Sequence, residues 1–208
     1  MKIYETLKKH LDDGNLEQSV LYSIDVIKNK KISIVDLYQD VLAKILNDIS
    51  CDQSDEECIW YEHQRTAIVR NIVDALFPYL IEEKAASNNQ KVLVVCPSEE
   101  YHEIGAKMAA DFFYLLGYET TFVGANTPLE NIVSAVKMIS PDYLAISVTN
   151  YYNIVSAKKI IESLRNINPN LKILAGGQAF LIEGAGDIVG VDQLVFSFDD
   201  IKALEGHK

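Results

Sequence analysis

Glu100, His102 and Gly105 lie close together in the sequence, directly after the apolar run 91–96. The imidazole of His102 can donate a nitrogen lone pair to a transition metal. A carboxylate two residues earlier can accept the other ring N–H, which fixes the tautomer and orientation of a coordinating imidazole. Gly105 has no side chain to obstruct the close approach of a bulky ligand. A histidine just past a strand end is by default a surface residue, so a ligating role for His102 depends on the residues that surround it.

Hydroxyl and glycine residues recur at the ends of two later apolar runs. They are Ser147 and Thr149 in the third run, and Gly176 and Gly177 at the end of the fourth run. Because the carboxyl ends of parallel strands meet at one edge of a sheet, these residues are expected near His102. Two hydroxyls and several glycines around one imidazole predict an open, polar-walled slot with a floor free of side chains.

Short β-rich runs alternate with amphipathic helices beyond residue 90. The runs are 91–96, 119–124, 143–149, 172–176 and 193–197. This alternation predicts an α/β fold, with a doubly wound, five-stranded parallel sheet covered by helices on both faces. Thr127, Pro128 and Glu130 predict a capping box at the start of the helix that follows the second run.

The first eighty or so residues carry apolar side chains at helical spacing. Asp13-Gly14 separates the first predicted helix from the second, and 29–31 separates the second from the third. Four helices joined by short connections predict a four-helix bundle. The expected domains are a helical bundle over 1–84, a polar linker over 85–90 and an α/β domain over 91–208.

The segment 91–198 resembles the cobalamin-binding domain of corrinoid proteins. That family carries the pattern D-x-H-x-x-G, then S-x-L or S-x-T, then G-G. Here the three parts are Glu100-x-His102-x-x-Gly105, Ser147-x-Thr149 and Gly176-Gly177. The resemblance implies a flavodoxin-like (Rossmann-like) domain that binds cobalamin, as adenosylcobalamin or methylcobalamin.

The resemblance also implies a role for each of these residues. His102 would replace the dimethylbenzimidazole base as the lower ligand of cobalt. Glu100 takes the place of the usual aspartate, a substitution seen in cobalamin-dependent photoreceptor repressors and their relatives. We expect Glu100 to accept a hydrogen bond from His102, and the alternative is a carboxylate that faces solvent. The displaced nucleotide tail would occupy a slot lined by Gly105, Ser147, Thr149, Gly176 and Gly177.

The helical bundle resembles the cap that covers the upper face of cobalamin in the same proteins. The photoreceptor-like group carries a W-x9-E-H signature there, and Glu62-His63 match its second half. The tryptophan and its neighbour fall at Asp52 and Gln53 in this chain. We expect Glu62 and His63 near the cofactor, and the alternative for His63 is packing or capping of its helix. Aromatic residues expected in packing or interfaces rather than at the cofactor are Trp60, Tyr61, Tyr151 and Tyr152.

The composition limits the classes of partner. The chain has 208 residues and a formal net charge of −11, whereas nucleic-acid binding needs clustered Lys and Arg, so direct DNA binding is not expected. The N-terminus lacks the apolar core of a signal peptide, and no apolar run approaches the roughly 20 residues that span a bilayer. We therefore expect a cytoplasmic protein without a membrane segment. The cysteine count of 3 is odd, which predicts reduced thiols rather than a disulfide framework.

The expected function is that of a stand-alone cobalamin-binding protein, which senses the cofactor or light and acts through a protein partner. The alternative is a methyl-carrying corrinoid protein that shuttles a methyl group for a methyltransferase. Glu100 and Glu62-His63 favour the sensor, while Asp52 and Gln53 suit the carrier at least as well. Neither interpretation expects an independent catalytic activity, and assembly into a homo-oligomer stays open.

Overall fold

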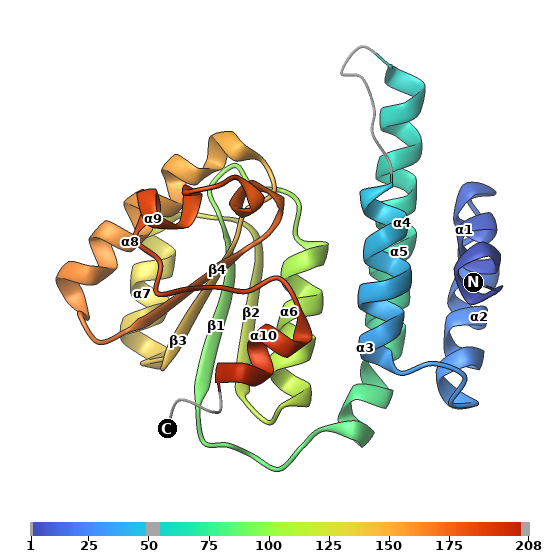
Figure 1. The fold of residues 1–208 in the computed structure, drawn as a ribbon, viewed down its shortest axis with the longest axis horizontal. Helices are drawn as coiled ribbons and strands as arrows, with labels where there is room; N and C mark the ends of the chain where they lie inside the picture. Colours follow the sequence, from blue (N-terminus) through green and yellow to red (C-terminus); the bar gives the residue numbers. More distant parts are fainter. Residues whose placement is uncertain (1, 49–54, 205–208) are drawn as a thin grey trace. The chain divides into compact units, whose positions relative to one another are not determined.

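The computed structural model describes residues 2–48 and 55–204 of the chain. The chain divides into two compact units, Met1–Glu83 and Lys84–Lys208 (Figure 1). The first unit is helical, and the second is built on a sheet. Within the described ranges, no helix has the length and apolar character needed to cross a membrane.

The described residues of the helical unit form four helical segments. The first two are α1 (Lys2–Asp12) and α2 (Leu16–Lys28), and the last is α5 (Glu56–Glu83). The third is a continuous run of α3 (Ile34–Asp36), π-helical η1 (Leu37–Leu42) and α4 (Ala43–Asn47). The first two breaks lie where the sequence predicted them. Asn15 ends the first break because its side-chain oxygen accepts a hydrogen bond from the N–H of Gln18 at 3.0 Å and caps α2. Ser33 caps α3 in the same way through the N–H of Asp36.

The second unit is a five-stranded sheet in which every strand pair is parallel. Its strands are β1 (Lys91–Pro97), β2 (Glu119–Thr127), β3 (Tyr143–Ser147), β4 (Lys172–Gly176) and β5 (Gln193–Leu194). The order β2-β1-β3-β4-β5 confirms the predicted doubly wound fold class. In this order the chain winds in opposite directions on the two sides of β1, so the β1/β3 boundary is the point where such sheets bind ligands.

Helices cover both faces of the sheet (Figure 1). The helical elements are α6 (Ile104–Leu115), α7 (Leu129–Ile139), η2 (Tyr151–Asn153), α8 (Ile154–Ile167), η3 (Gln178–Leu181), α9 (Ala185–Val189) and α10 (Phe198–Ala203). α6 and α10 pack together on one face, while α7 and α8 pack on the other. β1 is therefore buried on both sides, which explains its continuous apolar run: its residues 92–96 are all buried.

Two local predictions in this unit are wrong. Thr127 ends β2, and its hydroxyl donates to the carbonyl of Gly124 at 3.2 Å instead of capping a helix. The residue before α7 is Pro128, and no side chain caps that helix. β5 ends at Leu194, because Ser197 turns the chain into α10 by forming a capping box with Asp200.

The segment predicted as a linker packs against the end of α6. The N–H of Ala85 donates to the carbonyl of Leu115 at 2.8 Å, and the N–H of Asn88 donates to that of Gly117 at 3.1 Å. Gly117 has a φ of +84°, and a side chain there would clash with the carbonyl oxygen of Ala86. This contact attaches the start of the sheet unit to the α6–β2 corner.

Gly117→Ala is expected to destabilise the protein more than Gly184→Ala does. Both glycines have positive φ, +84° and +79°, but a Cβ at Gly184 would meet nothing within 4 Å. Gly184→Ala should therefore cost only the backbone strain, about 1 kcal/mol, whereas Gly117→Ala adds a clash and should cost at least about 2 kcal/mol. Urea unfolding followed by circular dichroism measures both values, and equal losses would contradict the packed position of residues 85–90.

Candidate functional site

The carboxylate of Glu100 is fully buried beside His102. Glu100 lies in the loop between β1 and α6, and its side chain is 0 % exposed. Its Oε1 accepts a hydrogen bond from the backbone N–H of His102 at 3.0 Å and lies 2.6 Å from the Nδ1 atom of the same residue. The solvent-facing alternative for Glu100 is therefore wrong, and the predicted contact between the carboxylate and the imidazole is present.

The second oxygen of Glu100 binds the loop that follows β3. Oε2 accepts hydrogen bonds from the backbone N–H groups of Thr149 at 3.0 Å and Asn150 at 2.9 Å. The side-chain amide of Asn153, which is itself buried, donates to the same oxygen at 3.1 Å. One carboxylate thus joins the loops at the carboxyl ends of the two strands that meet at the switch point.

These contacts keep Glu100 ionised and determine which ring nitrogen of a neutral His102 carries the proton. Burial by itself would raise the pKa of Glu100, but the hydrogen bonds from His102, Asn150 and Asn153 outweigh it and lower the pKa to about 2. An ionised carboxylate can only accept hydrogen bonds, so the proton of a neutral imidazole lies on Nδ1. The Nε2 atom of His102 then carries the lone pair that a metal needs.

His102 and Gly105 leave room for a large group. The His102 side chain is 55 % exposed, and a Cβ at Gly105, in the first turn of α6, would meet no atom within 4 Å. In the described residues, no group of three or more His, Cys, Asp or Glu side chains could hold a metal ion. A single oriented imidazole suits a metal that brings its other ligands with it, as cobalt in a corrin ring does. The residues present therefore fit cobalamin.

Neighbouring backbone lies against the glycine pair at the end of β4. Ser147 is the last residue of β3 and pairs with Gly176. A Cβ on Gly176 would clash with the carbonyl oxygen of Val195, and one on Gly177, where φ is +95°, would clash with that of Val148. Backbone atoms occupy both Cβ positions, and the part of the two glycines in the cofactor slot stays a prediction. The glycines let the chain segments after β3, β4 and β5 approach one another closely.

Two asparagines complete the site and were missed by the sequence analysis. The Asn153 amide also donates to the carbonyl of Glu99 at 3.1 Å, and the side-chain oxygen of Asn150 accepts from the N–H of Tyr152 at 3.1 Å. Their only sequence signal is their place directly after a predicted strand, where many polar residues merely form turns. The residue types do not indicate that these asparagines donate hydrogen bonds to Glu100, which lies about fifty positions earlier.

The residues predicted for the upper face of cobalamin belong to the helical unit. Glu62 is half-buried and His63 is exposed, both near the start of α5, and their role at the cofactor stays a prediction. Asp52 and Gln53 lie outside the described residues. Trp60 is 65 % exposed, so packing within the chain does not account for it.

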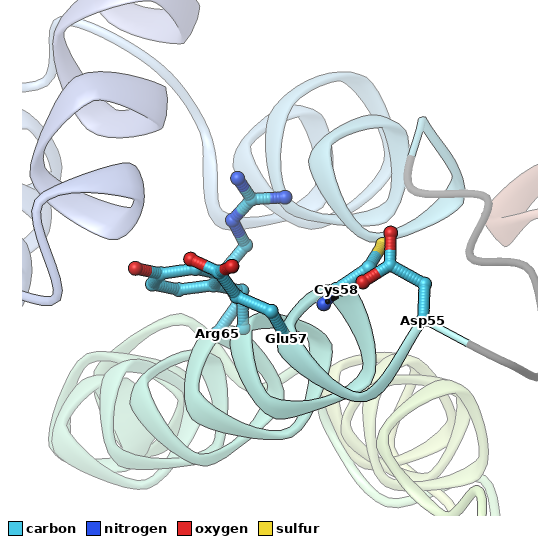
Figure 2. Close-up of a pocket in the computed structure, with 5 residues that line it drawn as sticks. Asp55, Glu57, Cys58 and Arg65 are labelled. Atoms are coloured by element: carbon cyan, nitrogen blue, oxygen red, sulfur yellow. Dashed lines mark hydrogen bonds between the residues drawn. The ribbon is translucent and has the colours of Figure 1, made fainter.

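A cavity of about 290 Å³ lies at the start of α5 (Figure 2). Its described lining residues are Asp55, Glu57, Cys58, Tyr61 and Arg65. The guanidinium of Arg65 pairs with Asp12 at 2.7 Å.

Cys58 is disulfide-bonded, which makes the expectation of a reduced thiol wrong at that position, while Cys96 is a free, buried thiol.

Acid should weaken the folded state through Glu100. The ordinary pKa of 4.5 falls to about 2 in the folded chain, so the stabilisation is complete above pH 4.5 and is lost as the pH falls toward 2. Each pKa unit corresponds to about 1.4 kcal/mol, which makes the contribution on the order of 3 kcal/mol. Urea unfolding of the cofactor-free protein across this range should show a steeper loss of stability than the Glu100→Gln variant shows. Equal pH slopes would contradict this account of the carboxylate.

Comparisons with known proteins identify the family of the sheet unit. Residues 90–199, more than half of the chain, match the B12 binding domain. Trimethylamine corrinoid protein 2 of Methanosarcina acetivorans is 23 % identical over 146 residues, which cover 68 % of this chain and 67 % of that protein. The repressor CarH of Myxococcus xanthus is 26 % identical over 68 % of this chain, and CarA from the same organism is 30 % identical over 41 % of it. This chain spans only 47 % and 29 % of those two repressors.

Solved structures show the same fold. The monomethylamine corrinoid protein of Methanosarcina barkeri matches 99 % of this chain and 98 % of its own with a TM-score of 0.80 at 15 % identity. A cobalamin-binding protein from Desulfitobacterium hafniense matches with a TM-score of 0.54 at 16 % identity. The family match covers the strand ends that carry Glu100 and His102. The chain therefore belongs to the B12-binding domain family, as a corrinoid protein whose cofactor is cobalamin.

Proposed function

We propose that the chain holds cobalamin in the base-off, His-on form, with Nε2 of His102 as the lower ligand of cobalt. The observation that carries this proposal is the 2.6 Å contact between His102 Nδ1 and the buried Glu100 carboxylate. That contact fixes the ring orientation and raises the basicity of the coordinating nitrogen. Bound cobalamin would supply a cobalt–carbon bond whose carbon group can be transferred or released.

The nucleotide tail of the cofactor needs its own space once the imidazole replaces its base. The proposed slot runs beside the strand ends that carry the hydroxyls of Ser147 and Thr149. Gly105 supports this placement because no atom lies near its Cβ position. Gly176 and Gly177 would shape the slot indirectly, since their neighbours are backbone atoms of this chain. A bulky residue at Gly176 would disturb this packing as well as the slot, so Gly105 is the cleaner position to test.

We infer that the protein is a methyl-carrying corrinoid protein that works with a methyltransferase partner. What supports this is the match to the monomethylamine corrinoid protein along nearly the whole of both chains. The sequence match to the trimethylamine corrinoid protein also covers two thirds of each. In this role the buried Glu100 keeps His102 correctly oriented through each change of the carbon group, because four N–H groups besides the imidazole hold the carboxylate in place.

A regulatory sensor is the second candidate function. It is favoured by Glu100 in place of aspartate and by Glu62-His63 near the start of α5. In such a protein a change at the cofactor would alter binding to a partner or self-association. Glu100 and His102 would have the same role in a carrier and in a sensor. The two functions would differ in what removes the carbon group from cobalt, a methyltransferase in the carrier and light in the sensor.

His102→Ala should abolish the His-on absorption spectrum of the reconstituted protein. Without the imidazole, cobalt loses its protein ligand, and affinity for methylcobalamin should fall at least about tenfold. Dark titration followed by visible absorption measures both quantities. The matched control is His63→Ala, which removes an exposed histidine from the other unit and should keep the lower-ligand spectrum. A wild-type spectrum in His102→Ala would refute the proposed coordination.

Carrier and sensor predict different responses of the loaded protein. A carrier should exchange a labelled methyl group with a methyltransferase in the dark, because light by itself cleaves the cobalt–carbon bond. Its elution in size-exclusion chromatography should not change on illumination. A light-driven change in size without methyl exchange would instead favour the sensor and overturn the carrier proposal.

A further inference from the structure

A second set of hydrogen bonds holds the loop between β1 and α6, on the side of β1 opposite to β3. The side-chain Oε2 of Glu103 accepts from the backbone N–H of Ala125 at 2.7 Å. The side-chain oxygen of Asn126 accepts from the N–H of Glu99 at 2.8 Å, and the N–H of Asn126 donates to the carbonyl of Glu100 at 2.9 Å. We call these three hydrogen bonds the β2 contacts, because residues 125 and 126 lie at the end of β2.

The backbone at the β2 contacts adopts conformations that most side chains disfavour. Asn126 has a φ of +49° and Glu99 a φ of +66°, both in the left-handed region. Gly124 has a φ of +98°, and a Cβ there would lie 2.9 Å from Oε2 of Glu103. Such conformations cost free energy and persist where the surrounding structure holds them, which is common at functional sites. The end of β2 is therefore shaped to meet the loop that carries the proposed metal ligand.

Glu103 is held through its main chain as well as its side chain. Its carbonyl accepts from the N–H of Lys107 at 2.8 Å at the start of α6, while its carboxylate reaches the end of β2. Glu100, by contrast, binds the N–H and the ring of His102 and is itself held from the side of β3. The backbone on both sides of His102 is thus tied to a different neighbour of β1.

We propose that Glu103 and Asn126 are positioning residues, which hold the His102 loop at the height where Nε2 can reach cobalt. This inference rests on the proposed function, since it takes His102 as the lower ligand. Neither residue is expected to touch the cofactor. Glu100 determines the tautomer and direction of the ring, but a coordinating group must also stay within about 0.5 Å of its productive position. The β2 contacts supply that second restraint.

The pH at which coordination is lost measures how well His102 is positioned. Protonation of the imidazole competes with cobalt, so acid converts the His-on spectrum of bound methylcobalamin into a His-off spectrum. Coordination lowers the midpoint of this conversion, and tenfold weaker coordination raises it again by about one pH unit. Dark titrations followed by visible absorption would compare the wild-type chain with Glu103→Ala and Asn126→Gly. We expect both substitutions to raise the midpoint by about one pH unit.

Two features of these variants separate positioning from a general loss of structure. Glu103→Gln keeps a side-chain oxygen that can accept from the N–H of Ala125, so it should recover most of the wild-type midpoint. Asn126→Gly removes the acceptor for Glu99 but suits the positive φ, so the variant should still fold. Urea unfolding of the cofactor-free proteins checks that each variant is folded across the pH range of the titration.

Glu119→Ala is the matched control. Glu119 is the first residue of β2, at the opposite end of the strand from the β2 contacts. Its side chain is 70 % exposed and lies 3.8 Å from Nζ of Lys91. The substitution removes a carboxylate from the same strand without touching the His102 loop, so it should leave the midpoint at the wild-type value.

The outcomes separate this inference from the proposed coordination. A His-on wild type whose midpoint is unchanged in Glu103→Ala and Asn126→Gly would overturn the positioning role and leave the coordination intact. An equal shift in Glu103→Gln and Glu103→Ala would assign the effect to charge and also overturn it. A wild-type chain that binds methylcobalamin without a His-on spectrum would refute the coordination, and the positioning role with it.

Discussion

A buried carboxylate determines how this site is built. Removing the charge of Glu100 from water is unfavourable unless hydrogen bonds replace the lost hydration. The chain replaces it with N–H donors from His102, Thr149, Asn150 and Asn153. All of these donors come from two loops, so the burial of one charge requires both loops to keep a single arrangement. Orientation of the imidazole is a consequence of that requirement.

The sheet explains why those two loops meet. β1 and β3 are neighbours, and the crossovers leave β1 toward β2 on one side and enter β3 from the other. The loops at their carboxyl ends therefore diverge and leave an opening between them. Glu100 bridges this opening beneath the surface, while His102 lies exposed above it. A metal with four ligands of its own would need only such a fifth donor, so the proposed coordination requires no cluster of metal-binding side chains, and the described residues contain none.

The sequence contained the strands, the switch point and the Glu100–His102 pair, because these depend on local spacing and residue type. It could not reveal the contacts of Glu100 with residues 149–153, since backbone N–H groups have no residue signature and lie about fifty positions away. The sequence showed that residues 176 and 177 are glycines, but it did not show that backbone from distant positions approaches Gly176 and Gly177 closely. Thr127 had the type and spacing of a helix cap, yet strand pairing with β1 took precedence.

The lower-face geometry by itself does not distinguish a carrier from a sensor, and there is a physical reason. Both functions need an imidazole whose orientation and basicity stay constant while the carbon group on cobalt changes. Glu100 provides this constancy by lying wholly within the sheet unit, where contacts after β1 and β3 hold it. Whatever selects between a methyl acceptor and light must therefore act outside the hydrogen bonds that hold Glu100.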